Sequence, residues 1–133
     1  MLVTEYDVGP GAYGVAVAAD GAVWTSLTGR GELARVGPDG QVSRIRLDTG
    51  QSRPMVLARG PDDVIWFSRG DGRIGRTDPD GTVSSVPVLT PAGSPYGLCA
   101  GPDRTLWYTL MTADRIGRIS LDVLRSRRSR PEA

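Results

Sequence analysis

The chain of 133 residues contains no histidine and a single cysteine, and each shortage removes a class of site. Histidine is the side chain whose unperturbed pKa, about 6.5, suits acid–base catalysis near neutral pH, so that route is closed. One cysteine excludes an internal disulfide and any site built from several thiolates. Because Cys99 lies in an apolar run from Tyr96 to Ala100, we expect a buried structural thiol and not a nucleophile.

Long apolar runs and an excess of charge are also missing. No stretch approaches the ~20 apolar residues needed to cross a bilayer, and the first residues carry no basic and apolar leader pattern. Sixteen basic residues against fifteen acidic ones leave a net charge of +1, which gives no electrostatic footprint for nucleic acid. We therefore expect one cytoplasmic domain with no nucleic-acid partner and no membrane partner.

What the chain does contain is one short phrase, repeated three times. Its tryptophans are 42 and then 41 residues apart, and such a constant interval is typical of a repeat architecture. We interpret the three tryptophans as structural residues in the core between repeats. The phrases are Val23-Trp24-Thr25-Ser26, Ile65-Trp66-Phe67-Ser68 and Leu106-Trp107-Tyr108-Thr109.

A second phrase and a set of turn signals repeat at the same interval. Arg73-Ile74-Gly75-Arg76 returns as Arg115-Ile116-Gly117-Arg118, and its alternation predicts Ile74 and Ile116 inward. Pro-Asp-Gly follows twice and is a turn former, because proline presets φ and glycine accepts positive φ. Each unit thus resolves into four short strands, A to D. They are expected at residues 14–18, 22–26, 32–36 and 41–47, then 54–58, 64–68, 73–77 and 82–88, then 97–100, 105–109 and 115–120.

Four antiparallel strands in roughly 42 residues form the blade of a β-propeller. The predicted fold class is all-β, a partial propeller over residues 1–120 with blade repeats at about 10–50, 51–92 and 93–120. A β-sandwich is the structural alternative, since it too uses short strands with regular turns. Helical repeats are excluded because no window has apolar residues at helical spacing.

The strand count is unusual at both ends. Residues 1–9 contain Val3-Thr4-Glu5-Tyr6, which matches the D strands and predicts an orphan D strand, while the third unit has only A, B and C. Three blades are too few to close, because propellers typically have four to eight. The open blade edges then favour self-association. Residues 121–133 break the pattern, and their charge predicts a disordered basic tail.

These phrases at this period resemble the virginiamycin B lyase family, also called streptogramin B lyases. The match is carried over about residues 3–120 by Tyr-Gly-Val/Leu, Leu-Trp-Tyr/Phe-Thr/Ser, Arg-Ile-Gly-Arg and Pro-Asp-Gly. The resemblance implies a seven-bladed propeller, of which about three blades are present. It also implies Mg²⁺, a small cyclic peptide ligand, and a lyase reaction that opens a type B streptogramin by elimination at its ester, a form of antibiotic resistance.

In such a blade the D–A and B–C connections share one face, which is the expected ligand face. In the resembling enzymes a histidine can follow proline at the start of strand A, and a glutamate can follow strand B. The matching positions hold Tyr13, Met55 and Tyr96 for the first and Leu27, Arg69 and Leu110 for the second. We therefore predict no catalytic residue and no metal ligand, with Mg²⁺ implied by the family alone. The candidate ligand-face residues are Tyr13, Arg53, Met55, Arg69 and Tyr96.

Two acids, Asp71 and Asp114, lie near the B–C connections, but a hard-cation site generally gathers several oxygen ligands. Three hypotheses about function remain. The first is a truncated, non-catalytic lyase-like segment. The second is an assembly module in which two chains pair head to tail into a six-blade ring. The third is lyase activity with the missing blades supplied by another chain.

Overall fold

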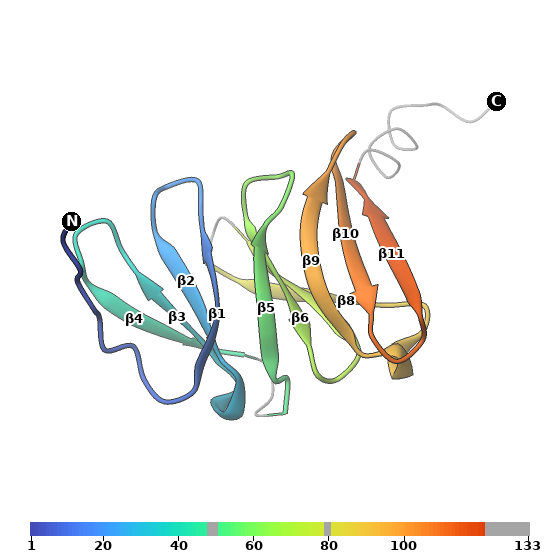
Figure 1. Cartoon of the computed structure of the whole chain (residues 1–133), viewed down its shortest axis with the longest axis horizontal. Helices are drawn as coiled ribbons and strands as arrows, with labels where there is room; N and C mark the ends of the chain where they lie inside the picture. The colour runs from blue at the N-terminus through green and yellow to red at the C-terminus, as the bar shows by residue number, and fades with distance from the viewer. Residues whose placement is uncertain (48–50, 79–80, 122–133) are drawn as a thin grey trace.

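A computed structural model describes residues 1–47, 51–78 and 81–121 (Figure 1). Within these ranges eleven strands form three antiparallel sheets with the orders β1-β2-β3-β4, β5-β6-β7-β8 and β9-β10-β11. The first sheet holds β1 (Ala12–Val17), β2 (Val23–Leu27), β3 (Glu32–Val36) and β4 (Val42–Arg46). The second holds β5 (Pro54–Arg59), β6 (Ile65–Arg69), β7 (Arg73–Thr77) and β8 (Val83–Pro87). The third holds β9 (Pro95–Gly101), β10 (Thr105–Leu110) and β11 (Arg115–Ser120).

The sheets stand side by side, with the first strand of each, β1, β5 and β9, next to one another (Figure 1). Two short 3₁₀ turns, Thr28–Arg30 and Pro91–Gly93, complete the regular structure of the described ranges. This confirms the all-β class and the partial propeller. It disfavours the sandwich, because a sandwich packs two sheets on one core, whereas three sheets here pack in a row with their first strands adjacent. No helix in the described part of the chain is long and apolar enough to span a bilayer.

The turn phrases act as their chemistry predicts. In Pro38-Asp39-Gly40, Gly40 has φ of 85° and its N–H donates to the Gly37 carbonyl over 2.9 Å. The Asp39 carboxylate accepts from the Gln41 N–H over 3.0 Å. A positive φ costs little only for glycine, so the last residue of this phrase sets the β3–β4 hairpin.

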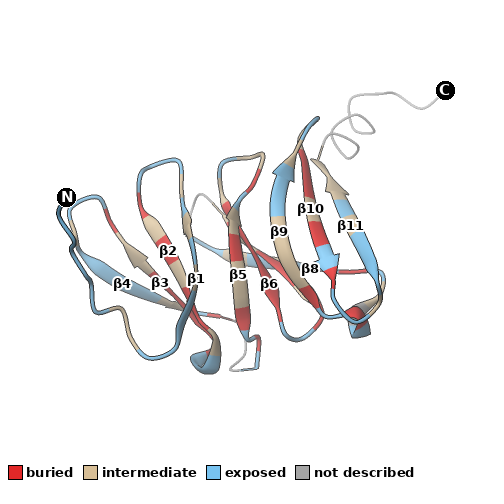
Figure 2. Cartoon of the chain, in the orientation of Figure 1, coloured by how far each residue is buried: buried red, intermediate tan, exposed pale blue. Residues whose placement is uncertain are grey.

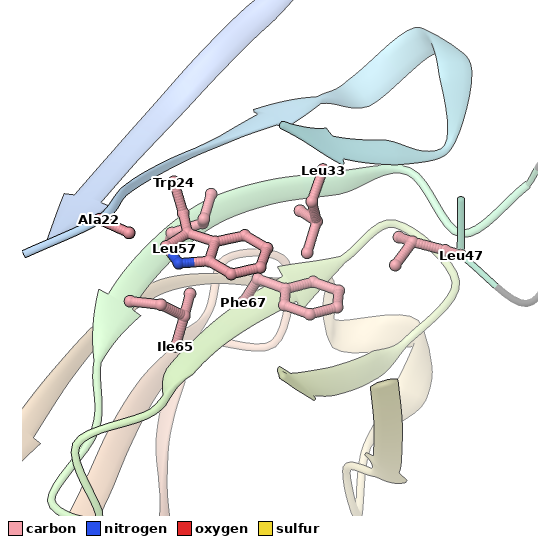
Figure 3. Packing of buried hydrophobic residues seen from close by; sticks show 7 residues of the cluster. All are labelled: Ala22, Trp24, Leu33, Leu47, Leu57, Ile65 and Phe67. Atoms are coloured by element: carbon pink, nitrogen blue, oxygen red, sulfur yellow. The ribbon is translucent and has the colours of Figure 1, made fainter. Parts of the chain in front are cut away.

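Two hydrophobic clusters lie between the sheets. β6, in the middle sheet, is buried along its whole length (Figure 2). The cluster between the first two sheets contains Trp24, Leu33, Leu57 and Phe67, and the indole of Trp24 lies close to Leu57 and Phe67 (Figure 3). The cluster between the second and third sheets contains Trp66. Its other buried residues are Ile74, Val88, Leu106, Tyr108 and Leu110.

The glycine of the Arg-Ile-Gly-Arg phrase makes room for the aromatic residue that follows tryptophan. A Cβ on Gly75 would lie 2.1 Å from the Phe67 ring, and one on Gly117 would lie 2.1 Å from the Tyr108 ring. In the first sheet the corresponding register pair is Thr25 and Ala34, so a smaller side chain on β2 leaves room for a methyl group on β3. The aromatic residue and the glycine are therefore coupled in the second and third repeats.

The prediction of an orphan D strand was wrong, because residues 3–6 form no strand and are exposed. A D strand pairs with a C strand, and the C strand that has no D strand among the described residues, β11, lies at the opposite end of the row (Figure 1). The N-terminal segment instead lies beside the first sheet, where the Arg44 side chain donates from Nε to the Val8 carbonyl over 3.1 Å. The strand is missing because its partner edge is not available to it.

Two further expectations in the third sheet were wrong. Cys99 is exposed, and Ile116 has a relative accessibility of 67%, although both were expected to be buried. Both side chains lie on the face that the next blade would cover, and no further blade follows in the described residues. The predicted tail falls largely on residues 122–133, which lie outside the described residues.

Candidate functional site

The D–A and B–C connections meet at one end of the blades. In the second sheet the N–H of Gly70 donates to the carbonyls of Ser52 and Arg53, over 3.1 and 2.9 Å. In the third sheet, Thr112 of the B–C connection donates its N–H to the carbonyl of Gly93, which precedes strand A, over 2.9 Å. This end of the molecule is the face on which the sequence placed its candidate ligand residues.

Strand A of every sheet reaches this face through an irregularity in its pairing with strand B. The register shifts between Ala12 and Val15 in β1, and equivalent shifts occur in β5 and β9. At each shift a hydroxyl from strand B replaces the missing ladder bond. Ser26, Ser68 and Thr109 accept from the backbone N–H of Gly14, Val56 and Gly97 over 2.9, 3.1 and 2.8 Å.

Ser26 also joins two sheets, because its hydroxyl donates to the Met55 carbonyl over 2.6 Å. Sequence reasoning missed this role, although the signal was present. A serine or threonine stands two residues after every tryptophan, on a strand whose alternate positions are otherwise mostly apolar.

Replacing Ser26 with alanine is expected to lower the free energy of unfolding by about 1–3 kcal/mol, because the Gly14 N–H and the Met55 carbonyl both lose a buried partner. Urea unfolding followed by tryptophan fluorescence measures this loss. Ser43→Ala, at an exposed position of β4, is the control and should change the free energy by less than about 0.5 kcal/mol. Equal effects of the two substitutions would contradict the bridging role of Ser26.

Two of the candidate ligand residues meet across the inner strands. The phenol oxygens of Tyr13 on β1 and Tyr96 on β9 are hydrogen-bonded, and the rings pack edge to face with centroids 6.4 Å apart. The hydrogen bond with Tyr13 raises the pKa of the Tyr96 phenol above its usual value of 10. Met55, at the same position of β5, is half-buried between them in the strand order.

The two candidate arginines are not alike. Arg53 is exposed and has φ of 50°, and its side chain packs against Gly70. Arg69 is 2% exposed and forms an ion pair with Asp71, with Nε donating to Oδ1 over 3.0 Å. Arg53 is therefore accessible on this face, whereas Arg69 is a buried cation with a structural ion pair.

The residues present do not fit a magnesium site. Asp71 is held by Arg69, Asp114 is an exposed turn residue with φ of 54°, and no group of three metal-binding side chains occurs within residues 1–47, 51–78 and 81–121. The end positions of strand B add nothing, since Leu27 and Leu110 are buried and apolar. No step through a metal ion can be assigned to these residues.

A cleft of about 510 Å³ lies at the other end of the blades, between the turns of the first and second sheets. Its acidic residues are already paired. Asp20 binds Arg35, and Arg76 binds both Asp62 and Asp78. The backbone N–H of Ala22, followed by Arg35, lowers the pKa of Asp20. The pairs of Asp20 with Arg35 and of Asp62 with Arg76 join the A–B turn of each sheet to strand C of the same sheet.

The sequence of the chain is similar to those of known lyases. The model of the virginiamycin B lyase family matches residues 1–126. Virginiamycin B lyases of Bordetella pertussis (strain Tohama I) and Bordetella bronchiseptica (strain RB50) are each 40% identical to the chain, over 58 and 61 residues. These matches cover 41% and 44% of this chain, but 19% and 20% of the two lyases.

Solved structures show the same relationship over more of the chain. A streptogramin B lyase superposes with a TM-score of 0.83 at 28% identity, covering 90% of this chain and 41% of that one. The virginiamycin B lyase of Staphylococcus aureus gives 0.78 at 31% identity, covering 84% and 39%. A catalytically inactive form of that enzyme, with one histidine changed to alanine and with quinupristin, gives 0.76 at 27% identity, covering 81% and 37%. The chain spans less than half of each of these proteins.

Proposed function

The chain belongs to the virginiamycin B lyase family, and from this premise we propose that it is a three-bladed lyase-type segment that does not catalyse the ring-opening elimination by itself. The observation that carries the proposal is the chemistry of the matching positions. Strand A offers Tyr13, Met55 and Tyr96 where a base is needed, and strand B ends in two buried leucines and the ion-paired Arg69.

Elimination at an ester needs a group that removes the proton next to the carbonyl. Tyr96 is a poor choice, because a phenol with the usual pKa of about 10 is protonated at neutral pH and the hydrogen bond with Tyr13 raises the pKa of Tyr96 further. The chain has no histidine to take its place. In the Staphylococcus aureus virginiamycin B lyase, the form with a single histidine-to-alanine change is described as catalytically inactive. A propeller of this family that lacks histidine altogether is therefore expected to be inactive as well.

Incubating the purified chain with Mg²⁺ and a type B streptogramin is expected to give no more ring-opened product than buffer with Mg²⁺ alone. Mass spectrometry of the mixture measures the product, and a full-length lyase of the family is the positive control. Product that appears with the chain, depends on Mg²⁺ and grows with protein concentration would overturn the proposal.

A further inference from the structure

The three repeats allow one position to be compared in three surroundings. Leu33, Ile74 and Ile116 are equivalent, since each is the register partner of the serine or threonine on strand B. The first two are completely buried and the third is 67% exposed. The tryptophans follow the same order, with Trp24 and Trp66 buried and Trp107 half-buried. The third sheet thus exposes the face that the first two sheets bury.

This exposed surface is named the Trp107 face, and it consists of Gly97, Cys99, Trp107, Thr109 and Ile116. A groove of about 430 Å³ lies on it and is lined almost entirely by apolar atoms of these residues and their neighbours. The same face of the second sheet, which includes Trp66 and Ile74, is covered by Leu106, Tyr108 and Leu110 of the third sheet.

The opposite end of the row exposes the complementary kind of face. Val15 is 67% exposed, whereas its equivalent in the second sheet, Leu57, is 6% exposed against the Trp24 cluster. Val17 on the same strand is 51% exposed. We name this surface the Val15 face, and it consists of Val15, Val17, Val23 and Thr25. Within the chain, the equivalent face of each following sheet packs against the tryptophan face of the sheet before it.

The Trp107 face is already shaped like its buried counterpart. The guanidinium of Arg118 lies 5.7 Å from the Trp107 ring centroid, as that of Arg76 lies 5.6 Å from the Trp66 ring centroid. The Trp107 Nε1 also donates to Thr105 Oγ1 over 3.1 Å. These contacts hold the indole in place before anything binds, and preorganisation of this kind lowers the entropic cost of association.

We propose that the Trp107 face of one chain packs on the Val15 face of a second copy, head to tail, so that two chains close a ring of six blades. The inference rests on the proposed function, because it supplies neighbours for the outer faces of the three described sheets. It extends a contact that the chain already makes twice between its own sheets. Reciprocal pairing uses both open faces of both copies, so the assembly stops at a dimer when the rotation between the two chains closes the ring.

Two polar features fit the same arrangement. Ser26 donates across the first interface to the Met55 carbonyl, so the equivalent Thr109 hydroxyl would donate to the carbonyl of Tyr13 in the second copy. The exposed residues 3–6 would then lie beside the outer edge of β11 in the other chain, which pairs with no strand of residues 1–47, 51–78 or 81–121, and complete its sheet as a D strand. The N-terminal phrase thereby gains the partner that it lacks within one chain.

Sedimentation velocity over a range of micromolar concentrations tests the association with the full chain. The wild-type protein is expected to sediment with the mass of two chains. Ile116→Asp is expected to shift it to one chain, because a charge is then placed in the apolar interface. Met111→Asp is the matched control, since Met111 is also apolar and 58% exposed but lies in the turn outside the Trp107 face, and it should remain dimeric. A monomeric wild type, or a ladder of larger masses, would overturn the closed dimer.

Disulfide cross-linking tests whether the two chains pair head to tail. Cys99 is the chain's single cysteine and lies on the Trp107 face. Its equivalent in the first sheet, Ala16, packs against the cluster that contains Leu57, the equivalent of Val15, so Val15 of a second copy would lie near Cys99. Mild oxidation of Val15→Cys should link the introduced thiol to Cys99 of another chain, as identified by peptide mass mapping. Wild-type protein should form little disulfide. Efficient Cys99–Cys99 linkage in the wild type would show symmetric pairing and overturn the head-to-tail arrangement. These assays contain no antibiotic, so a chain that opens the streptogramin yet dimerises would refute only the proposed function.

Discussion

Replacing Trp66 with alanine is expected to lower the free energy of unfolding by about 3–5 kcal/mol, because the side chain is 3% exposed and its removal leaves a cavity between two sheets. The same substitution at Trp107 is expected to cost about 1–2 kcal/mol, because that ring is half-buried and one side already faces solvent. The two tryptophans share a repeat position and a stacked arginine, so the comparison isolates the effect of a neighbouring blade.

Urea unfolding at the lowest protein concentration that gives a signal measures both losses in the monomer. The fluorescence of the remaining tryptophans reports the transition. At concentrations where the head-to-tail dimer forms, the cost at Trp107 should rise towards that at Trp66, since a second copy then covers the ring. Equal losses in dilute monomer would contradict the assignment of Trp107 to an open face.

The repeat architecture could be predicted from the sequence because its signals are local. The tryptophan spacing fixes the repeat length, and the turn phrases fix the ends of strands. The eleven strands accordingly lie at the predicted positions to within about two residues, the usual disagreement at element ends. Local pattern also identifies which side chains share a face, as the alternation along β7 and β11 shows.

What the pattern lacks is information about whether a face has a neighbour. Ile74 and Ile116 occupy identical phrases, yet one is buried and the other exposed, because only the second sheet is followed by another sheet within the described ranges. Cys99 was misplaced for the same reason. Residues 3–6 have the sequence of a strand and no partner edge, so intrinsic propensity alone does not form one.

The candidate site was less predictable, because it depends on contacts between repeats. Tyr13 and Tyr96 are 83 residues apart in the chain and meet through their hydroxyls. Arg69 was placed on the ligand face by its position after strand B. Its burial follows from sharing a face of β6 with Phe67, and Asp71 two residues later compensates the charge. The sequence shows that Arg69 and Asp71 are close along the chain, but it does not show that Arg69 is buried away from solvent.

Removing the carboxylate of Asp71 is expected to destabilise the fold through Arg69. In Asp71→Ala the guanidinium, whose side chain is 3% exposed, loses the ion pair seen in the structure. Breaking a buried pair from one side costs about 3–5 kcal/mol, and since the Asp71 side chain is 31% exposed, solvent reduces the expected loss to about 2–3 kcal/mol. Arg59→Ala is the control, because it breaks a pair with Asp63 whose side chains are 48% and 65% exposed, and about 0.5 kcal/mol or less is expected.

The other two repeats suggest a second substitution that should restore part of the stability lost in Asp71→Ala. Leucine occupies the position of Arg69 in the other two sheets, as Leu27 and Leu110, and both are buried. Adding Arg69→Leu to Asp71→Ala removes the buried charge that has lost its ion pair with Asp71 and fills the site with the side chain that the fold already accepts there, so the double variant should recover part of the lost free energy. Urea unfolding of the wild type, the two single variants and the double variant gives the coupling between the two residues. If the double variant is no more stable than Asp71→Ala, the loss comes from the loop at Asp71 and not from the Arg69 guanidinium.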